Sequence, residues 1–288
     1  MKKLIAVLIL SLTLFSCSSG SKKDDANLSE NKLTPKEVKA SGSKTEANPL
    51  PDKKAEAAAV NPSALSDAKQ AEFDQAIVSG DDEKIRKASQ DMLQINSKNS
   101  KALNALAMSH YKKQQYEAAI LLLNKALGVN PNASEVYNNL GLVELAKNNR
   151  KEAITMFRKS LQVNPDNQFA AANAAAIYAR EKDYSKVVFT LERAVSNNKA
   201  SAGTINNYAI ALVATGKANE AASLYEKILK DNPDNKSFIL NYSILLIEKQ
   251  AKYKEGLDLV NRLKFVGADN ESRQVIKELE IKAKAGLK

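Results

Sequence analysis

The chain has 288 residues, of which 44% are hydrophobic and 6% aromatic, and its formal net charge is +10. Its wealth of Ala, Leu, Lys and Glu, with no Trp, favours helices over sheets. Most of its cations are Lys, a hydrated point charge, so the basic balance indicates weak attraction to anionic surfaces rather than a shaped phosphate site. The single cysteine excludes an intrachain disulfide.

The chain starts with MKKLIAVLILSLTLFSC: two lysines, an apolar run over residues 4–15, and Cys17. This is the layout of a secretory signal peptide, and the apolar run is too short to span a membrane. Its end resembles the bacterial lipoprotein box, which implies a signal peptide over residues 1–16 and acylation of Cys17, palmitate included. The following Ser18 and Ser19 imply the outer membrane, facing the periplasm. The alternative is an ordinary signal peptide that merely ends near a cysteine.

Residues 17–62 are mostly Lys, Asp, Ser, Glu, Ala and Pro, with few large apolar side chains. Such a segment cannot bury enough apolar surface to offset the entropy lost on ordering, so it is predicted to be a disordered, lipid-anchored tether. Some 45 residues, at roughly 5–6 Å × √n, reach about 35–40 Å on average. The tether would let a folded domain search the space beneath a membrane, or it could fill that domain's own binding groove.

Beyond the tether the sequence repeats with a period of 34 residues. Pro131 and Pro165 are one period apart, Pro233 lies two periods further on, and Lys199 holds the place between them. This period is typical of tetratricopeptide repeats, helix–turn–helix units that stack into a solenoid. Five units resemble that family's motif. In one of them the aromatic, Leu-Gly, Ala, Phe and Pro places are Tyr137, Leu140, Gly141, Ala153, Phe157 and Pro165.

Within each unit the apolar residues follow the i, i+3, i+4, i+7 spacing of a helix. The resemblance implies an all-α fold, a right-handed α-solenoid of about five to six tetratricopeptide repeats over residues 63–267. The first unit is degenerate. The fifth has one extra residue, which we expect near Gln250–Lys252.

Residues 268–288 are predicted to form a capping helix, because the last repeat of a solenoid needs a cover for its apolar face. Asp269 or Asn270 could begin this helix. Its apolar side chains recur at helical spacing, and the remainder is charged. The residues expected to face the last repeat are Val275, Ile276 and Leu279.

Asparagines recur in the middle of the first helix of four units, although Asn is a mediocre helix former. In stacked repeats of this kind, the first helices form the inner wall, and residues three and six places after each Asn should share it. The predicted wall is an apolar groove with a ladder of amides that could bond a peptide backbone. The predicted peptide-binding residues are Asn139, Asn173, Asn207, Asn241, Met108, Tyr111, Leu142, Leu145, Ile210, Val213, Ile244 and Ile247, with Ala176 and Ala179 in the same rows.

The asparagines could instead bond neighbouring helices and serve only the scaffold, and the spacing leaves both roles open. A clamp for C-terminal carboxylates, as in chaperone-binding members of the family, would need a basic residue just before each Asn. Those positions hold Asn138, Ala172, Asn206 and Leu240. A ligand with an acidic tail held in that way is therefore not expected.

The sequence offers no constellation for catalysis. His110 is the only histidine and takes the motif's inter-helix Tyr place, so we expect it to be a packed structural residue. One His and an acylated Cys cannot build a Cys/His metal site, and no glycine-rich phosphate loop occurs. The runs EKIRK and NNRKEA are interpreted as solvated helix faces or turns. We therefore predict a protein that is not an enzyme, with no cofactor, no metal and no nucleic-acid partner.

The leading hypothesis is an outer-membrane adaptor that holds a hydrophobic or amphipathic segment of an envelope protein in its groove. Its layout resembles the pilotin-type lipoproteins of type IV pilus systems, which implies help in assembling a secretin. One alternative is an adaptor that recruits a periplasmic protease or cell-wall enzyme. Another is a structural component of a gliding or other envelope machine.

Overall fold

The computed structural model describes residues 62–198, 200–267, 270 and 272–288, with the side chains described from residue 66 onward. Within these ranges every regular element is a helix. The predicted signal peptide, the lipidation of Cys17 and the tether over residues 17–62 fall almost wholly outside them. The chain divides between Ser97 and Lys98 into two compact units.

The first unit contains one helical hairpin, α2 (Pro62–Ser79) and α3 (Asp82–Ile95). Gly80 turns the chain at φ 68°, and the Asp81 carboxylate accepts hydrogen bonds from two backbone N–H groups in the first turn of α3. Phe73 and Met92 are buried, as expected of a repeat-like hairpin.

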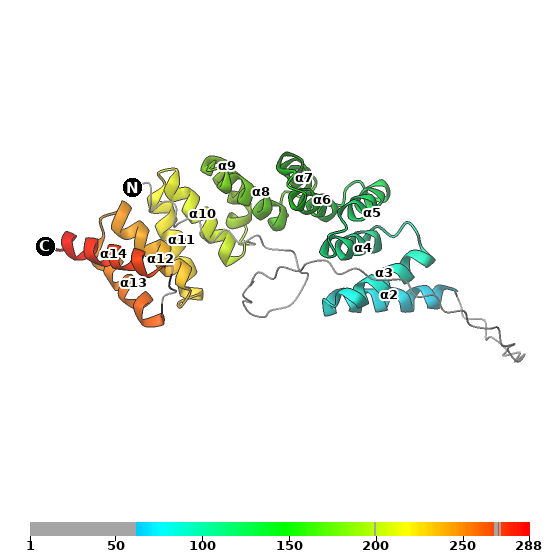
Figure 1. Ribbon diagram of the computed structural model, residues 1–288, viewed down its shortest axis with the longest axis horizontal. Coiled ribbons are helices and arrows are strands. Elements are labelled where there is room, and N and C mark those ends of the chain that lie inside the picture. Colours follow the sequence, from blue (N-terminus) through cyan, green and yellow to red (C-terminus); the bar gives the residue numbers. More distant parts are fainter. Residues whose placement is uncertain (1–61, 199, 268–269, 271) are drawn as a thin grey trace, which may run out of the picture. The chain divides into compact units, whose positions relative to one another are not determined.

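The second unit is a series of five consecutive hairpins followed by one more helix (Figure 1). This arrangement confirms the predicted all-α solenoid of helix–turn–helix repeats with a C-terminal capping helix. The hairpins are α4 (Ser100–Lys112) with α5 (Tyr116–Val129), α6 (Ser134–Ala146) with α7 (Arg150–Val163), α8 (Gln168–Arg180) with α9 (Tyr184–Ser196), α10 (Ala202–Ala214) with α11 (Ala218–Asp231), and α12 (Lys236–Ile244) plus η1 (Leu245–Lys249) with α13 (Tyr253–Val266); the last helix is α14 (Arg273–Gly286).

Asparagine and proline set the boundaries between repeats. Helices α5, α7 and α11 are each followed by an Asn before Pro, whose backbone leaves the α region because the residue before Pro avoids it. Three residues later a polar side chain begins the next first helix in two of these loops. The Oδ1 atoms of Asn167 and Asn235 accept from Ala170 N and Phe238 N, at 3.1 Å each.

Each hairpin turns through three residues, of which the middle one has positive φ. These residues are Gln114 (59°), Asn148 (65°), Lys182 (60°), Gly216 (87°) and Ala251 (51°). The left-handed conformation lets the turn end the first helix, and Gly, followed by Asn, adopts it with the least strain. Gly216 and Asn148 therefore suit this backbone, whereas Gln114, Lys182 and Ala251 are strained by it.

We expect Gly216→Ala to lower the free energy of unfolding by about 1 kcal/mol, because an L side chain is strained at φ 87°. A Cβ at this position would meet no atom within 4 Å, so the effect is one of backbone alone. Gly128→Ala is the matched control, since it lies in α5, also in open space, and should raise stability by roughly 0.5–1 kcal/mol. Urea unfolding of both variants checks this; a loss of stability in both would contradict the assignment to φ.

The extra residue of the fifth repeat lies inside its first helix and not in the turn near Gln250–Lys252, where it was expected. All five turns have the same length, whereas the fifth first helix contains a π-helical stretch, Leu245–Lys249. In the other hairpins the last turn N–H bonds to a carbonyl five residues back, as from Lys217 to Leu212. In the fifth, Lys252 N reaches six back to Leu246 O, at 2.9 Å. The π-helical stretch accommodates the inserted residue, so the three-residue turn between the two helices keeps its length.

The capping helix packs as predicted, with Val275, Ile276 and Leu279 buried. Its start differs, because α14 begins at Arg273 and Asn270 lies outside it. Salt bridges also join α14 to its neighbours. Glu280 lies between Lys264 of α13 and Lys284, at 2.9 and 2.7 Å, and hydrogen bonds from these lysines lower the pKa of its carboxyl.

Candidate functional site

The recurring asparagines bond to each other across the seams between repeats. The amide nitrogen of Asn139 donates to Asn104 Oδ1 at 2.8 Å, joining α6 to α4. In the same way Asn173 donates to Asn138 at 3.0 Å, joining α8 to α6. Each bond spans 35 residues, so it pairs the ladder Asn of one repeat with the residue just before the ladder position of the preceding repeat.

The seam between α12 and α10 has the same bond and one more. Asn241 Nδ2 donates to Asn206 Oδ1 at 2.9 Å, and the hydroxyl of Tyr225 donates to the same oxygen at 3.2 Å. Tyr225 is only 1% exposed, and burial raises the pKa of its hydroxyl far above the usual range. It is therefore a permanent donor. These contacts give three of the four ladder asparagines a scaffold role.

One seam lacks this bond. Ala172 occupies the place opposite Asn207, where the other seams have an Asn. Within the described residues the Asn207 side chain forms no hydrogen bond, and it is half-buried, unlike the buried Asn139, Asn173 and Asn241. Phe169, one helical turn before Ala172 and on the same face of α8, is 50% exposed. An unpaired amide and an exposed aromatic ring therefore lie on the wall at this one seam.

The predicted apolar rows are accessible in part. Met108, Tyr111, Leu145 and Val213 are half-buried, whereas the other members of the rows are buried. Buried members with little access to a ligand are Leu142, Ala176, Ala179, Ile210, Ile244 and Ile247.

Ile247 does not lie on the wall. A Cβ on Gly256 would come within 3.0 Å of the Ile247 side chain, so Ile247 packs inside the hairpin against α13. The π-turn is the cause, because one inserted residue rotates the end of the helix and brings Glu248 to the wall position. The carboxylate of Glu248 then pairs with Lys282 of the capping helix at 2.5 Å.

Sequence reasoning missed the acceptors of the ladder, which are Asn104, Asn138 and Asn206. The signal was present in the sequence as a spacing of 35 between paired asparagines, beside the repeat period of 34. His110 is half-buried, and its Nδ1 lies 2.6 Å from Gln115 Oε1 in the turn that follows α4. This contact agrees with a structural histidine.

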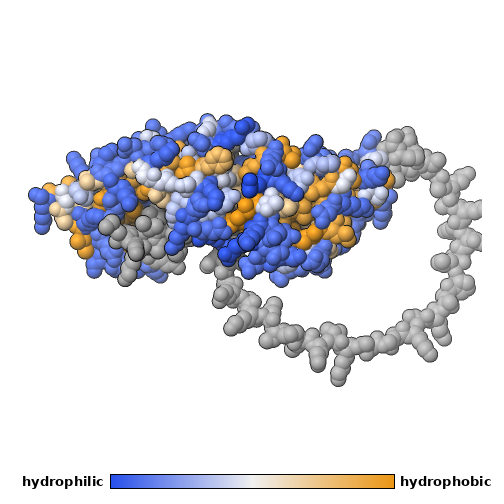
Figure 2. All heavy atoms as spheres, turned by 90° about the horizontal axis from the view of Figure 1, so that it is seen from above, coloured by the Kyte–Doolittle hydropathy of each residue, from blue (hydrophilic) through white to orange (hydrophobic). Residues whose placement is uncertain are grey.

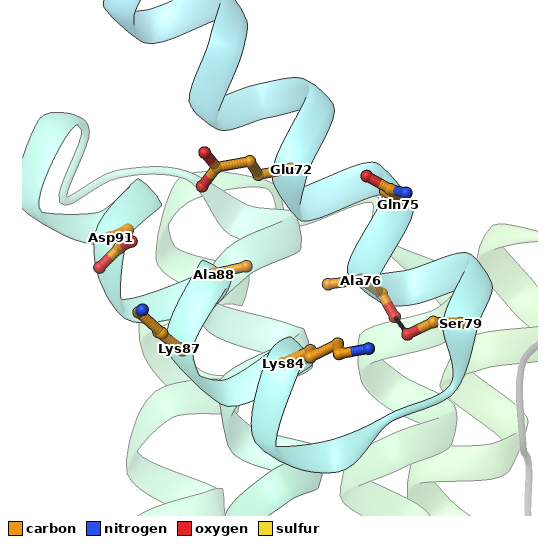
Figure 3. A pocket seen from close by; sticks show the side chains of 8 residues that line it. All are labelled: Glu72, Gln75, Ala76, Ser79, Lys84, Lys87, Ala88 and Asp91. Atoms are coloured by element: carbon orange, nitrogen blue, oxygen red, sulfur yellow. Dashed lines mark hydrogen bonds between the residues drawn. The ribbon is translucent and has the colours of Figure 1, made fainter.

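A hollow lies in the first unit, between α2 and α3, with a volume of about 320 Å³ (Figure 3). Ala76 and Ala88 face each other across it, and polar side chains of both helices surround them. Lys84 and Lys87 bring positive charge, whereas Glu72 and Asp91 bring negative charge, and Lys69 pairs with both carboxylates at 2.7 and 3.2 Å. This balanced lining selects neither anions nor cations.

On the face shown in Figure 2, hydrophilic side chains predominate and apolar ones gather in patches between them. Several large apolar side chains are well exposed, Phe189 of α9 and Phe265 of α13 most of all, at 82% and 92%. In the described ranges no three His, Cys, Asp or Glu side chains gather as metal ligands would. No described helix combines the length and the apolar character that crossing a bilayer requires.

Known proteins share this fold. The family model for the tetratricopeptide repeat matches residues 104–168. YrrB, described as a TPR protein with an unusual peptide-binding site, is 20% identical with a TM-score of 0.56, over 69% of this chain and 99% of YrrB. PilF of Pseudomonas aeruginosa is 20% identical with a TM-score of 0.50, over 65% of this chain and 88% of PilF.

MamA of Desulfovibrio magneticus RS-1 is 16% identical, with a TM-score of 0.50, over 58% of this chain and 94% of MamA. No curated protein matched the sequence. At these identities the solved structures show the fold alone, and the matched sequence model adds the repeat type. Residues 104–168 thus match the tetratricopeptide repeat, and the chain has the fold of a tetratricopeptide-repeat solenoid.

Proposed function

We propose that this protein is a non-enzymatic adaptor that holds a hydrophobic or amphipathic peptide segment of an envelope protein on the wall of its first helices. The protein would be anchored to the outer membrane through Cys17 and face the periplasm. The fold supports a protein-binding scaffold, and YrrB, which shares the fold, is described as having an unusual peptide-binding site. Help in assembling a secretin or pilus is the narrower form of the proposal.

The main support for the proposal is the missing Asn–Asn hydrogen bond between α8 and α10, where Ala172 lies opposite Asn207. The Asn207 amide retains two donors and its acceptor oxygen, which can bond the N–H and C=O of an extended or helical peptide. Phe169 offers an aromatic surface beside it, and Val213 adds a half-buried apolar contact further along the wall. Met108, Tyr111 and Leu145 extend the same surface over the earlier repeats.

A photo-reactive aromatic residue placed at Phe169 tests this directly. In envelopes of the source cell, illumination should crosslink it to one partner, and mass spectrometry should map the link to a hydrophobic or amphipathic segment. Phe189 is the matched control, because it is more exposed but lies on a second helix. The same crosslinks from both positions, or from Phe189 alone, would place binding elsewhere.

The captured segment, made as a peptide, should bind the variant Phe169→Ala with Asn207→Ala at least about tenfold more weakly, a loss of about 1.4 kcal/mol. The melting temperature should change little, because neither side chain supports a buried partner. The identity of the partner also separates the alternatives: a secretin, a hydrolase or a machine component.

Cys17→Ser tests the anchor. Two or more acyl chains hold a protein stably on a bilayer, so the wild-type protein should fractionate with the outer membrane and the variant with the soluble periplasmic fraction. Metabolic labelling with palmitate should mark the wild type alone. Equal labelling of both, or a wild type that is soluble, would remove the anchor from the proposal and leave the peptide-binding wall untouched.

A further inference from the structure

The five turns between first and second helices lie along one edge of the solenoid. Asn–Asn bonds at a constant spacing of 35 residues hold three of the four pairs of neighbouring first helices parallel and in register, so the C-terminal ends of these helices meet at the same edge. Two side-chain contacts join adjacent turns directly. Lys147 Nζ lies 2.7 Å from Glu117 Oε1, and Gln250 Nε2 donates to Asn219 Oδ1 at 2.9 Å.

This edge has a net positive charge. We define the basic edge as the seven-residue stretches that start at the last residue of each first helix: 112–118, 146–152, 180–186, 214–220 and 249–255. Together they contain twelve Lys and Arg side chains against six Asp and Glu, a net charge of +6.

The opposite edge has the reverse sign. The described residues of the four loops between repeats, 129–136, 163–170, 196–198, 200–204 and 231–238, contain one Lys against four Asp and Glu, a net charge of −3. Contacts there neutralise cations of the second helices, as where Arg193 meets Asp166 at 2.7 Å. The two edges of the solenoid thus carry net charges of opposite sign.

Much of the charge on the basic edge is available to a partner. Arg150, Lys182, Lys252 and Lys254 are exposed, and none of them forms an ion pair within the part of the chain that the structure describes. Some of the remaining charges are paired locally, as Lys186 is with Asp183. Ten of the twelve cations are Lys, whose compact hydrated charge suits a diffuse anionic surface better than a bidentate phosphate site.

We propose that the basic edge docks on an anionic phospholipid surface. Adjacent turns follow each other at roughly the 10 Å spacing of packed helices, close to one Debye length at physiological salt, so several cations act on one bilayer together. The first helices would then stand with their C-terminal ends toward the lipid, and the wall around Asn207 would remain open. This proposal does not depend on peptide binding or on acylation of Cys17.

Vesicle sedimentation tests the basic edge. The full chain would carry Cys17→Ser, so that no acyl chain contributes, and would be mixed with phosphatidylcholine vesicles with or without about 30 mol% phosphatidylglycerol. The edge variant combines Arg150→Gln, Lys182→Gln, Lys252→Gln and Lys254→Gln. The matched control combines Arg158→Gln, Lys125→Gln, Lys230→Gln and Lys236→Gln, which removes the same charge from exposed residues outside the basic edge.

We expect the partition coefficient on anionic vesicles to fall at least about tenfold in the edge variant and less than about twofold in the control at 0.1 M salt. Binding to neutral vesicles should be equal in all three proteins. Equal losses in both variants would overturn the proposal, because net charge and not the basic edge would then govern binding, and no loss in either would overturn it as well. Binding of the edge to an acidic polymer but not to vesicles would also overturn it. Peptide affinity, measured in parallel, should be unchanged.

Discussion

Asn206→Ala is expected to lower the free energy of unfolding by about 2–4 kcal/mol. The Asn206 oxygen accepts hydrogen bonds from the Asn241 amide at 2.9 Å and from the Tyr225 hydroxyl at 3.2 Å. All three residues are buried, so the substitution leaves two donors without their partner in a place that water reaches poorly. Each orphaned donor costs about 1–3 kcal/mol. Urea unfolding followed by circular dichroism would measure the loss.

Asn207→Ala is the matched control, one residue further along the same helix. Its amide has no hydrogen bond among the described residues, so stability should change by less than about 0.5 kcal/mol. Adding Tyr225→Phe to Asn206→Ala should recover part of the loss, because one orphaned donor is then removed. Equal losses for the two single variants would contradict the division between scaffold and binding asparagines.

This division shows what the sequence could predict and what it could not. The 34-residue period placed the hairpins, and the Asn-Pro steps placed the ends of the second helices, because both depend on local backbone preferences. The period also aligned Asn139, Asn173, Asn207 and Asn241 as equivalent residues. They are not equivalent, since the partner of each lies 35 residues earlier and one of the four partners is Ala172.

The predicted wall differs from the structure for a similar reason. The wall residues were predicted as those three and six places after each Asn, which assumes that each first helix is one continuous α-helix. That assumption holds through α10 and is wrong in the fifth repeat, where the π-turn at Leu245–Lys249 rotates Ile247 into the hairpin. An extra residue in a repeat can either lengthen a loop or form a π-helical turn within a helix. Here the packing of Ile247 against Gly256 favours the π-helical turn, and this contact joins two different helices, so the local sequence does not reveal it.

Gly141→Ala is expected to lower the free energy of unfolding by about 2–3 kcal/mol, although Ala normally favours a helix over Gly by up to about 1 kcal/mol. A Cβ on Gly141 would lie 2.5 Å from Cε1 of Phe157 and 2.6 Å from Cδ1. The ring is fully buried and cannot withdraw, because Ala153, Ala174 and Ile177 belong to the same packed cluster. Helices α6 and α7 would have to separate. Thermal and urea unfolding would both report the loss.

Two comparisons make this prediction specific to the contact between Gly141 and Phe157. Gly128→Ala, in open space on α5, should stabilise the protein, so opposite signs at two helical glycines would exclude a general effect of the substitution. Phe157→Leu opens room, and in that background Gly141→Ala should cost at least about 1 kcal/mol less than in the wild type. Strict additivity in this double-mutant cycle would contradict the clash. Because α6 also contributes Asn138 and Asn139 to the ladder, a hairpin forced apart here should loosen two seams at once.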